Sequence, residues 1–115
     1  MHYDWLTKPL IDSKTGLLYN RAASFFLYFA TDCTSGATYF PHISPPPDTF
    51  NESERYTTTV NRSGLAVLPR LGSGVFWLNL HPNRTGDTQL IHAGLPVTSG
   101  TKVGLNIWFK DTISI

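Results

Sequence analysis

The chain contains one cysteine, Cys33, so no disulfide bond can form within its 115 residues. It contains no run of lysine or arginine, and its formal net charge is +1, which gives no support for a nucleic-acid partner. No apolar stretch approaches the roughly 20 residues needed to cross a bilayer. Polar residues follow Met1 directly, so we expect no signal peptide in this chain. These absences leave one small globular domain, residues 1–115.

Several catalytic signatures are absent as well. The chain has no Gly-x-Ser-x-Gly nucleophile motif, no Gly-x-Gly-x-x-Gly motif and no P-loop. Glu52 and Glu54 lie in a proline-rich segment, residues 42–55, that predicts an exposed loop, so a carboxylate pair for glycoside hydrolysis has poor support. The chemistry of this chain must therefore come from other residues.

Turn residues are abundant, with nine glycines and eight prolines. Between them lie short segments rich in aromatic and β-branched residues, which predict strands. The predicted strands are residues 22–30, 37–40, 57–60, 65–68, 74–80, 88–92 and 102–109. Residues 6–20 are predicted to form a loop or a broken turn, because no periodic apolar stripe follows the possible caps there. Many short strands with turn-rich links predict an all-β sandwich, jelly roll or barrel.

Two histidines and one aspartate form the main chemical pattern. His2 and Asp4 are two residues apart, so in an extended chain their side chains share one face, about 6.5 Å apart along the backbone. His92 would arrive from a separate strand. Two imidazoles and one carboxylate are the ligand set of a non-haem Fe(II) site with open positions. The alternatives are a solvated His2 and a core His92 that bonds to backbone.

Lys102 follows His92 by ten residues and begins an apolar run. It is either an inward-facing anchor for the far end of a dicarboxylate or a surface lysine whose stem packs on the strand. His42 and His81 compete with His92 as ligands, but both are predicted to lie in exposed loops or turns. Cys33 has no second cysteine with which to form a thiolate zinc site.

Six segments of the chain occur in an order typical of one enzyme family. They are residues 2–4 (HYD), 21–28 (RAASFFLY), 35–41 (SGATYFP), 69–77 (PRLGSGVFW), 92–97 (HAGLPV) and 100–108 (GTKVGLNIW). Together they resemble the catalytic domain of the prolyl 4-hydroxylase alpha-subunit type of Fe(II)/2-oxoglutarate dioxygenase. The resemblance covers nearly the whole chain, and the joint spacing is more specific than any one segment. It implies a double-stranded β-helix, a variant of the jelly roll.

The resemblance implies a role for each matched position. His2, Asp4 and His92 would be the iron ligands. Lys102, helped by the hydroxyl of Thr38, would be the partner of the 2-oxoglutarate C5 carboxylate. The implied cofactors are Fe(II), 2-oxoglutarate as co-substrate and L-ascorbate.

The resemblance also implies a substrate and its binding residues. Trp108 would line the co-substrate pocket, and Arg21 would lie near a groove for a peptide or protein substrate. The implied reaction is hydroxylation of peptidyl proline, which consumes O2 and releases succinate and CO2.

The chain also departs from this family. It starts at the proposed iron motif, so we expect the N-terminal strands and helices of the domain to be missing. A catalytically inactive, truncated β-rich remnant or binding module is therefore the alternative to a hydroxylase, and an unrelated jelly-roll binding domain with structural histidines is a third hypothesis. Glycosylation sequons at Asn51, Asn61 and Asn83, together with the family, favour the lumen of the endoplasmic reticulum.

Overall fold

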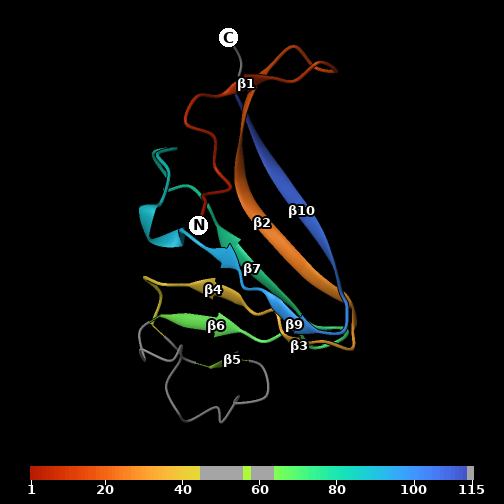
Figure 1. The fold of residues 1–115 in the computed structure, drawn as a ribbon. Coiled ribbons are helices and arrows are strands. Elements are labelled where there is room, and N and C mark those ends of the chain that lie inside the picture. The colour runs from red at the N-terminus through yellow and green to blue at the C-terminus, as the bar shows by residue number, and fades with distance from the viewer. Residues whose placement is uncertain (45–55, 58–63, 114–115) are drawn as a thin grey trace.

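The structure is a computed structural model, described for residues 1–44, 56–57 and 64–113 (Figure 1). Its strands are β1 (Leu10–Ile11), β2 (Leu18–Thr31), β3 (Thr34–Ser35), β4 (Thr38–Phe40), β5 (Tyr56–Thr57), β6 (Leu65–Val67), β7 (Gly74–Leu78), β8 (Ala93–Gly94), β9 (Val97–Ser99) and β10 (Lys102–Ile113). A short 3-10 helix spans Thr88–Leu90. No described helix is long and apolar enough to cross a membrane. The prediction of an all-β chain is confirmed.

The two longest strands, β2 and β10, pair antiparallel along almost their whole length, and Figure 1 shows them side by side. β1 and β7 also pair with β2, so one sheet has the order β1–β2–β10 with β7 alongside β2. The register of β2 and β10 shifts between Val103 and Gly104. A Cβ atom at Gly104 would overlap the ring of Phe26, so only glycine allows this close approach.

A second sheet, in the order β5–β6–β4–β8, packs against the first, and β3 and β9 form a separate pair. Phe40 of β4 meets Trp77 of β7 with ring centroids 5.1 Å apart. Tyr28 of β2 is 1% exposed, and its hydroxyl lies 2.7 Å from that of Thr38 in β4. Because β10 pairs only with β2 among the described strands, the sheets form an open sandwich of jelly-roll type and no closed barrel.

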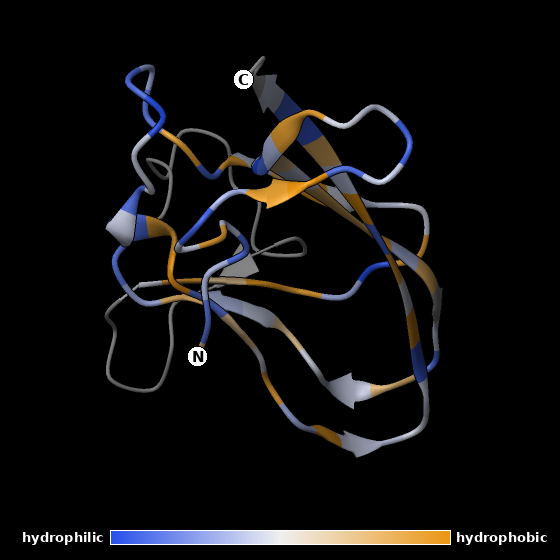
Figure 2. Cartoon of the chain, turned by 90° about the horizontal axis from the view of Figure 1, so that it is seen from above, coloured by the Kyte–Doolittle hydropathy of each residue, from blue (hydrophilic) through white to orange (hydrophobic). Residues whose placement is uncertain are grey.

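The outer face of the first sheet is apolar. Alternation along each strand places Phe25, Phe76 and Phe109 on this face, opposite to the inward-pointing Tyr28 and Trp77. Phe76 and Phe109 are 52% and 50% exposed, and their rings lie 6.1 Å apart. Figure 2 shows hydrophobic residues recurring along these strands.

The prediction of a strand at residues 88–92 is wrong. The carboxylate of Asp87 accepts a hydrogen bond from the amide of Gln89 at 3.0 Å and caps the 3-10 helix Thr88–Leu90. A side-chain acceptor at this position offers the backbone a turn in place of a strand ladder. The consequence for the site is that His92 follows the helix directly and leads into β8.

The prediction of a loop at residues 6–20 also needs correction. β1 pairs with the first residues of β2, so β2 begins at Leu18 and not at residue 22. Asp12 closes the turn between β1 and β2. Its carboxylate accepts a hydrogen bond from the amide of Lys14 at 2.8 Å, and its carbonyl accepts one from the amide of Gly16 at 2.8 Å.

The other predicted strands match β2, β4, β6, β7 and β10 to within a few residues, while β3 and β9 lie where no strand was predicted. The edge strand predicted at residues 57–60 overlaps β5, and residues 58–60 lie outside the described residues. Most of the predicted loop at residues 42–55, and the sequons at Asn51 and Asn61, lie outside them too.

Candidate metal centre and adjoining pocket

A backbone bridge joins the first residues of the chain to its distal histidine. The amide of His2 donates to the carbonyl of His92 at 2.9 Å, and the amide of His92 donates to the carbonyl of His2 at 3.0 Å. The two imidazole centroids therefore lie 4.4 Å apart. Asp4 points to the same place, and its Oδ1 lies 3.3 Å from Nε2 of each histidine. The structure thus brings together the three residues that the sequence proposed as ligands.

The three potential ligand atoms lie within 4.8 Å of one another, and no other such group occurs among the residues the structure describes. Asp4 and His92 are each 4% exposed, whereas the side chain of His2 is 60% exposed. The cluster therefore has one side in the core and one side at the surface. Two imidazole nitrogens and one carboxylate oxygen, placed so closely, fit a non-haem Fe(II) ion.

The backbone sets the orientation of the His92 ring. Its Nδ1 lies 2.9 Å from the carbonyl oxygen of Leu90. Because a carbonyl can only accept, Nδ1 carries the proton in the neutral ring and Nε2 turns a lone pair towards Asp4 and His2. Phe40 and Trp77 pack against the ring, with centroids 5.3 and 4.9 Å away. Metal-ligating histidines commonly show this arrangement, in which the second nitrogen donates to a carbonyl.

Asp4 and His92 stabilise each other's charged forms. Burial opposes the ionisation of Asp4, but hydrogen bonds from His92, Ser24 and Trp108 and the charge of His92 outweigh it and lower the pKa of Asp4 from 3.8 to about 2. Burial likewise opposes protonation of His92, but its hydrogen bonds to Asp4 and to the Leu90 carbonyl raise its pKa above 6.5. When the His92 ring is charged, a bound metal would therefore have to displace the proton on its Nε2.

A cavity of about 90 Å³ adjoins the cluster. It is lined by His2, Phe26, Thr38, Trp77, His92, Gly94, Lys102 and Asn106. Both histidines of the cluster and the ammonium-bearing Lys102 thus open onto the same space. This pairing of potential metal ligands with a cation suits a ligand that carries a negative charge at its far end.

Lys102 and Thr38 reach this cavity from opposite sheets. Lys102 donates from Nζ to the carbonyl of Gly36 at 2.6 Å, and its partial burial lowers its pKa. Its position depends on the preceding turn, where Gly100 has a φ of +79° and a Cβ would overlap the carbonyl of Asp32. Thr38 is 6% exposed, and its hydroxyl is held by Tyr28.

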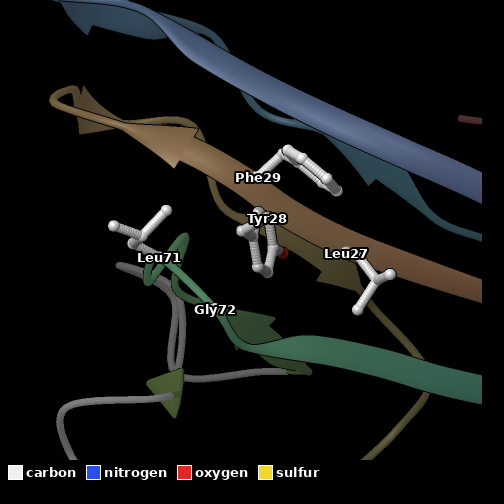
Figure 3. Close-up of a pocket in the computed structure, with 5 residues that line it drawn as sticks. All are labelled: Leu27, Tyr28, Phe29, Leu71 and Gly72. Carbon is white, nitrogen blue, oxygen red and sulfur yellow. The ribbon is translucent and has the colours of Figure 1, made fainter.

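A larger hollow of about 270 Å³ lies beside β2, lined by Leu27, Tyr28, Phe29, Leu71 and Gly72 (Figure 3). Figure 3 shows Tyr28 and Phe29 leaving β2 on opposite sides. Among its lining residues Tyr28 is the one titratable group, and none of the proposed ligands reaches it. The hollow therefore has no part in the candidate site.

Trp108 and Arg21 lie together beside Asp4. Trp108 donates from Nε1 to Oδ2 of Asp4 at 3.3 Å, and the guanidinium of Arg21 lies 3.8 Å from the centroid of the Trp108 ring. Neither residue is among those that line the 90 Å³ cavity. The structure thus places Trp108 against a proposed metal ligand rather than in the wall of the pocket expected for 2-oxoglutarate.

No protein-family model matches the chain. The chain is 32% identical over 110 residues to prolyl 4-hydroxylase subunit alpha-2 of Gallus gallus, which covers 96% of this chain and 17% of that protein. It is 30% identical over 108 residues to probable prolyl 4-hydroxylase 4 of Arabidopsis thaliana, with coverage of 93% and 35%. It is 30% identical over 111 residues to prolyl 4-hydroxylase subunit alpha-1 of Homo sapiens, with coverage of 96% and 17%. Over almost its whole length, the chain is similar to prolyl 4-hydroxylases.

The predicted resemblance to prolyl 4-hydroxylases is thereby confirmed. The chain spans between 17% and 35% of the length of these three relatives. Because each of the two alpha-subunit alignments covers 96% of the chain, both include the segment that carries His92.

Sequence reasoning missed three buried polar residues of the site. Ser24 donates from Oγ to Oδ2 of Asp4 at 2.6 Å, and Asn79 donates from Nδ2 to Oγ of Ser24 at 2.9 Å. Tyr28 holds Thr38. One signal could have identified Ser24 and Tyr28, because alternation along β2 puts these polar groups on one face of its otherwise apolar residues 22–30. Asn79 gave the same signal, because it is the one polar side chain in the predicted strand at residues 74–80 and shares a face with Trp77 there.

The competing ligands lie elsewhere. His42 is exposed in a turn after β4. His81 is exposed, and its Nε2 lies 3.9 Å from a carboxylate oxygen of Asp87. Cys33 is half-buried, and its thiol lies 3.6 Å from the carbonyl of Ser35. None of the three joins the cluster of His2, Asp4 and His92.

Proposed function

We propose that residues 1–115 form a single domain that carries an Fe(II)- and 2-oxoglutarate-dependent hydroxylation site for peptidyl proline. The reaction would consume O2 and release succinate and CO2. One observation carries the proposal: in a chain similar to prolyl 4-hydroxylases, a two-histidine, one-aspartate cluster and a half-buried lysine open onto the same cavity.

Two imidazole nitrogens and one carboxylate oxygen would hold the iron, namely Nε2 of His2, Nε2 of His92 and Oδ1 of Asp4. When bound with 2-oxoglutarate, iron supplies the activation of O2, of which one atom enters a substrate C–H bond and the other enters succinate as CO2 leaves. The protein's part is to hold the ligands in place. The Leu90 carbonyl fixes the His92 ring, and burial keeps water from one side of Asp4.

Lys102 would bind the distal carboxylate of 2-oxoglutarate. Its ammonium has three N–H donors, of which one is used by the Gly36 carbonyl, so two remain for a ligand. Burial lowers the pKa of Lys102 because the charged form lacks solvent, and a carboxylate in the cavity would supply the missing counter-charge. The Tyr28 hydroxyl can donate either to the Val67 carbonyl at 3.3 Å or to the Thr38 hydroxyl at 2.7 Å, and in the second arrangement the Thr38 proton is free to reach the same carboxylate.

The peptide substrate would approach from the side of Asp4 that Trp108 and Arg21 occupy. Trp108 is 41% exposed, and the guanidinium of Arg21 stacks on its ring. A partly exposed aromatic ring with a cation over it offers a flat surface and hydrogen-bond donors to a peptide. The stack would thus border the substrate groove without touching the co-substrate cavity.

Turnover with a proline-containing peptide tests the proposal. Succinate release in the presence of Fe(II), 2-oxoglutarate, O2 and ascorbate should be lost in His92→Ala, because one of three ligands is removed. His81→Ala is the matched control, since it removes an exposed histidine outside the cluster, and it should keep wild-type turnover. Full activity of His92→Ala would refute the ligand assignment.

A catalytically inactive β-rich binding module is the second candidate. The observation that favours it is that Asp4 and His92 already satisfy each other without a metal, as a buried pair at 3.3 Å. A folded sample that binds no Fe(II), Co(II) or Mn(II) would favour this candidate over the hydroxylase.

We also propose a location in the lumen of the endoplasmic reticulum. The support is similarity to prolyl 4-hydroxylases together with the sequon at Asn83, which is exposed in the turn between β7 and the 3-10 helix. The amide oxygen of Asn83 accepts from the Thr85 hydroxyl at 2.6 Å, so both polar side chains of the sequon lie together at the surface.

A further inference from the structure

The two carboxylate oxygens of Asp4 have different partners. Oδ1 faces the two histidines, with Nε2 of each at 3.3 Å. Oδ2 faces away from them and accepts hydrogen bonds from Oγ of Ser24 at 2.6 Å and from Nε1 of Trp108 at 3.3 Å. One oxygen is therefore directed towards the potential metal position, while the other is occupied by the protein.

The direction of these hydrogen bonds follows from the chemistry of the groups. An ionised carboxylate can only accept, so the single hydroxyl proton of Ser24 points to Asp4. Oγ of Ser24 must then accept from its other neighbour, and Nδ2 of Asn79 lies 2.9 Å away. A one-way chain of donors therefore runs from Asn79 through Ser24 to Asp4.

The side-chain amide of Asn79 is buried with one polar atom paired and the other unpaired. Asn79 and Ser24 are both 0% exposed, and the Oδ1 atom of Asn79 has no hydrogen-bond partner within the described part of the chain. An unpaired buried acceptor is unfavourable, so the amide is directed by its donor bond to Ser24. The backbone of Asn79 is fixed at both ends, because its amide donates to Ala22 at 2.7 Å and its carbonyl accepts from Asp87 at 2.8 Å.

We propose that Ser24 and Asn79, with Trp108, are positioning residues that hold Asp4 so that it offers only Oδ1 to a metal ion. This inference rests on the proposed iron site and adds residues that act through Asp4. A carboxylate that is free to rotate can bind a metal through both oxygens and fill a further coordination position. Ser24 of β2 and Trp108 of β10 occupy Oδ2, and Asn79 holds Ser24 in place; together they prevent this and keep that position open for other ligands.

Metal binding without co-substrate or peptide tests the inference directly. The probe is Co²⁺, whose affinity is measured by titration calorimetry and whose visible absorption reports the coordination number. Ser24→Ala removes the donor to Oδ2 and should weaken Co²⁺ binding by roughly 10- to 100-fold. It should also change the absorption spectrum, because Oδ2 keeps only its weaker donor, Trp108, and the carboxylate can turn this oxygen towards the ion. Ser24→Thr keeps the hydroxyl and should restore both the affinity and the spectrum.

Two further variants separate positioning from general destabilisation. Ser73→Ala also removes one serine hydroxyl, but this hydroxyl donates to the carbonyl of Arg70 at 2.6 Å and not to Asp4, so Co²⁺ affinity should stay within about twofold of wild type even where the melting temperature falls. Trp108→Phe changes a 41% exposed residue and removes only the weaker donor to Oδ2. It should fold and weaken Co²⁺ binding less than Ser24→Ala does, and it tests the inference where Ser24→Ala fails to fold.

The outcomes are distinct. A wild-type chain that binds Co²⁺ with the same affinity and spectrum as folded Ser24→Ala would overturn the positioning role and leave the iron site intact. If Ser24→Ala does not fold, unchanged affinity and spectrum in Trp108→Phe would overturn it. A folded wild-type chain that binds no Co²⁺ would overturn the proposed function together with this inference.

Discussion

Replacing Asp4 with asparagine should destabilise the metal-free protein by an amount that the structure allows us to work out. The pKa of Asp4 is lowered from 3.8 to about 2. Each pKa unit corresponds to about 1.4 kcal/mol, so the ionised carboxylate contributes roughly 2–3 kcal/mol to the free energy of unfolding. The asparagine side chain has the same shape but no charge, and its amide would face the donors of Ser24 and Trp108. We therefore expect Asp4→Asn to lose about that free energy.

The stability lost in Asp4→Asn should decrease as the pH falls. A carboxyl whose pKa is lower in the folded state stabilises the fold fully above its unfolded value of 3.8, and this stability disappears as the pH falls through about 2. The difference in stability between wild type and Asp4→Asn should thus be largest near pH 5, where His92 is protonated as well. It should shrink steadily between about pH 4 and pH 2.

Chemical denaturation in the presence of a chelator, from pH 2 to pH 7, is the appropriate assay. Asp111→Asn is the matched control, because Asp111 pairs with Arg84 at 3.1 Å in a partly exposed position. That variant should lose less than about 1 kcal/mol. Equal losses in the two variants, or a loss at Asp4 that stays constant down to pH 2, would refute the argument that a buried, ionised carboxylate is stabilised by its neighbours.

Two other predictions concern the binding of 2-oxoglutarate and of Co²⁺. Lys102→Met should weaken 2-oxoglutarate binding by roughly 10- to 100-fold, because a charged hydrogen-bond partner is lost, and should leave Co²⁺ affinity unchanged. A calorimetric titration with 2-oxoglutarate checks this. A variant that binds 2-oxoglutarate as tightly as the wild type would contradict it. Co²⁺ affinity should fall by about tenfold per pH unit as the pH drops below the pKa of His92, which lies above 6.5, because the metal must displace one proton there. An affinity that is constant from pH 8 to pH 5.5 would show that His92 is not a ligand.

Secondary structure was predictable where side-chain pattern alone decides it. The aromatic-rich segment that became β2 and the apolar run that became β10 were recognised, because strands of this composition pack on one or both faces. The failures came where a single side chain redirected the backbone. Asp87 caps a 3-10 helix in place of a strand, and Asp12 closes the turn that pairs β1 with β2. Local side-chain-to-backbone bonds of this kind leave little trace in hydrophobic periodicity.

The spacing of His2 and Asp4 already implied that both could face one metal, since residues two apart in an extended chain share a face. The sequence also favoured His92 over His42 and His81 as the third member, and the tertiary structure supplies the physical reason. His92, and neither His42 nor His81, joins the cluster because its backbone pairs with that of His2 across the fold.

The roles of the surrounding residues also depended on how the strands assemble. Ser24 of β2 and Trp108 of β10 meet at Oδ2 of Asp4, and Asn79, directly after β7, donates to Ser24. No local pattern encodes that meeting, because it arises from the pairing of β2 with β7 and β10. The sequence alone thus predicted which residues could be ligands, whereas the orientation of the Asp4 carboxylate depends on the folded sheet.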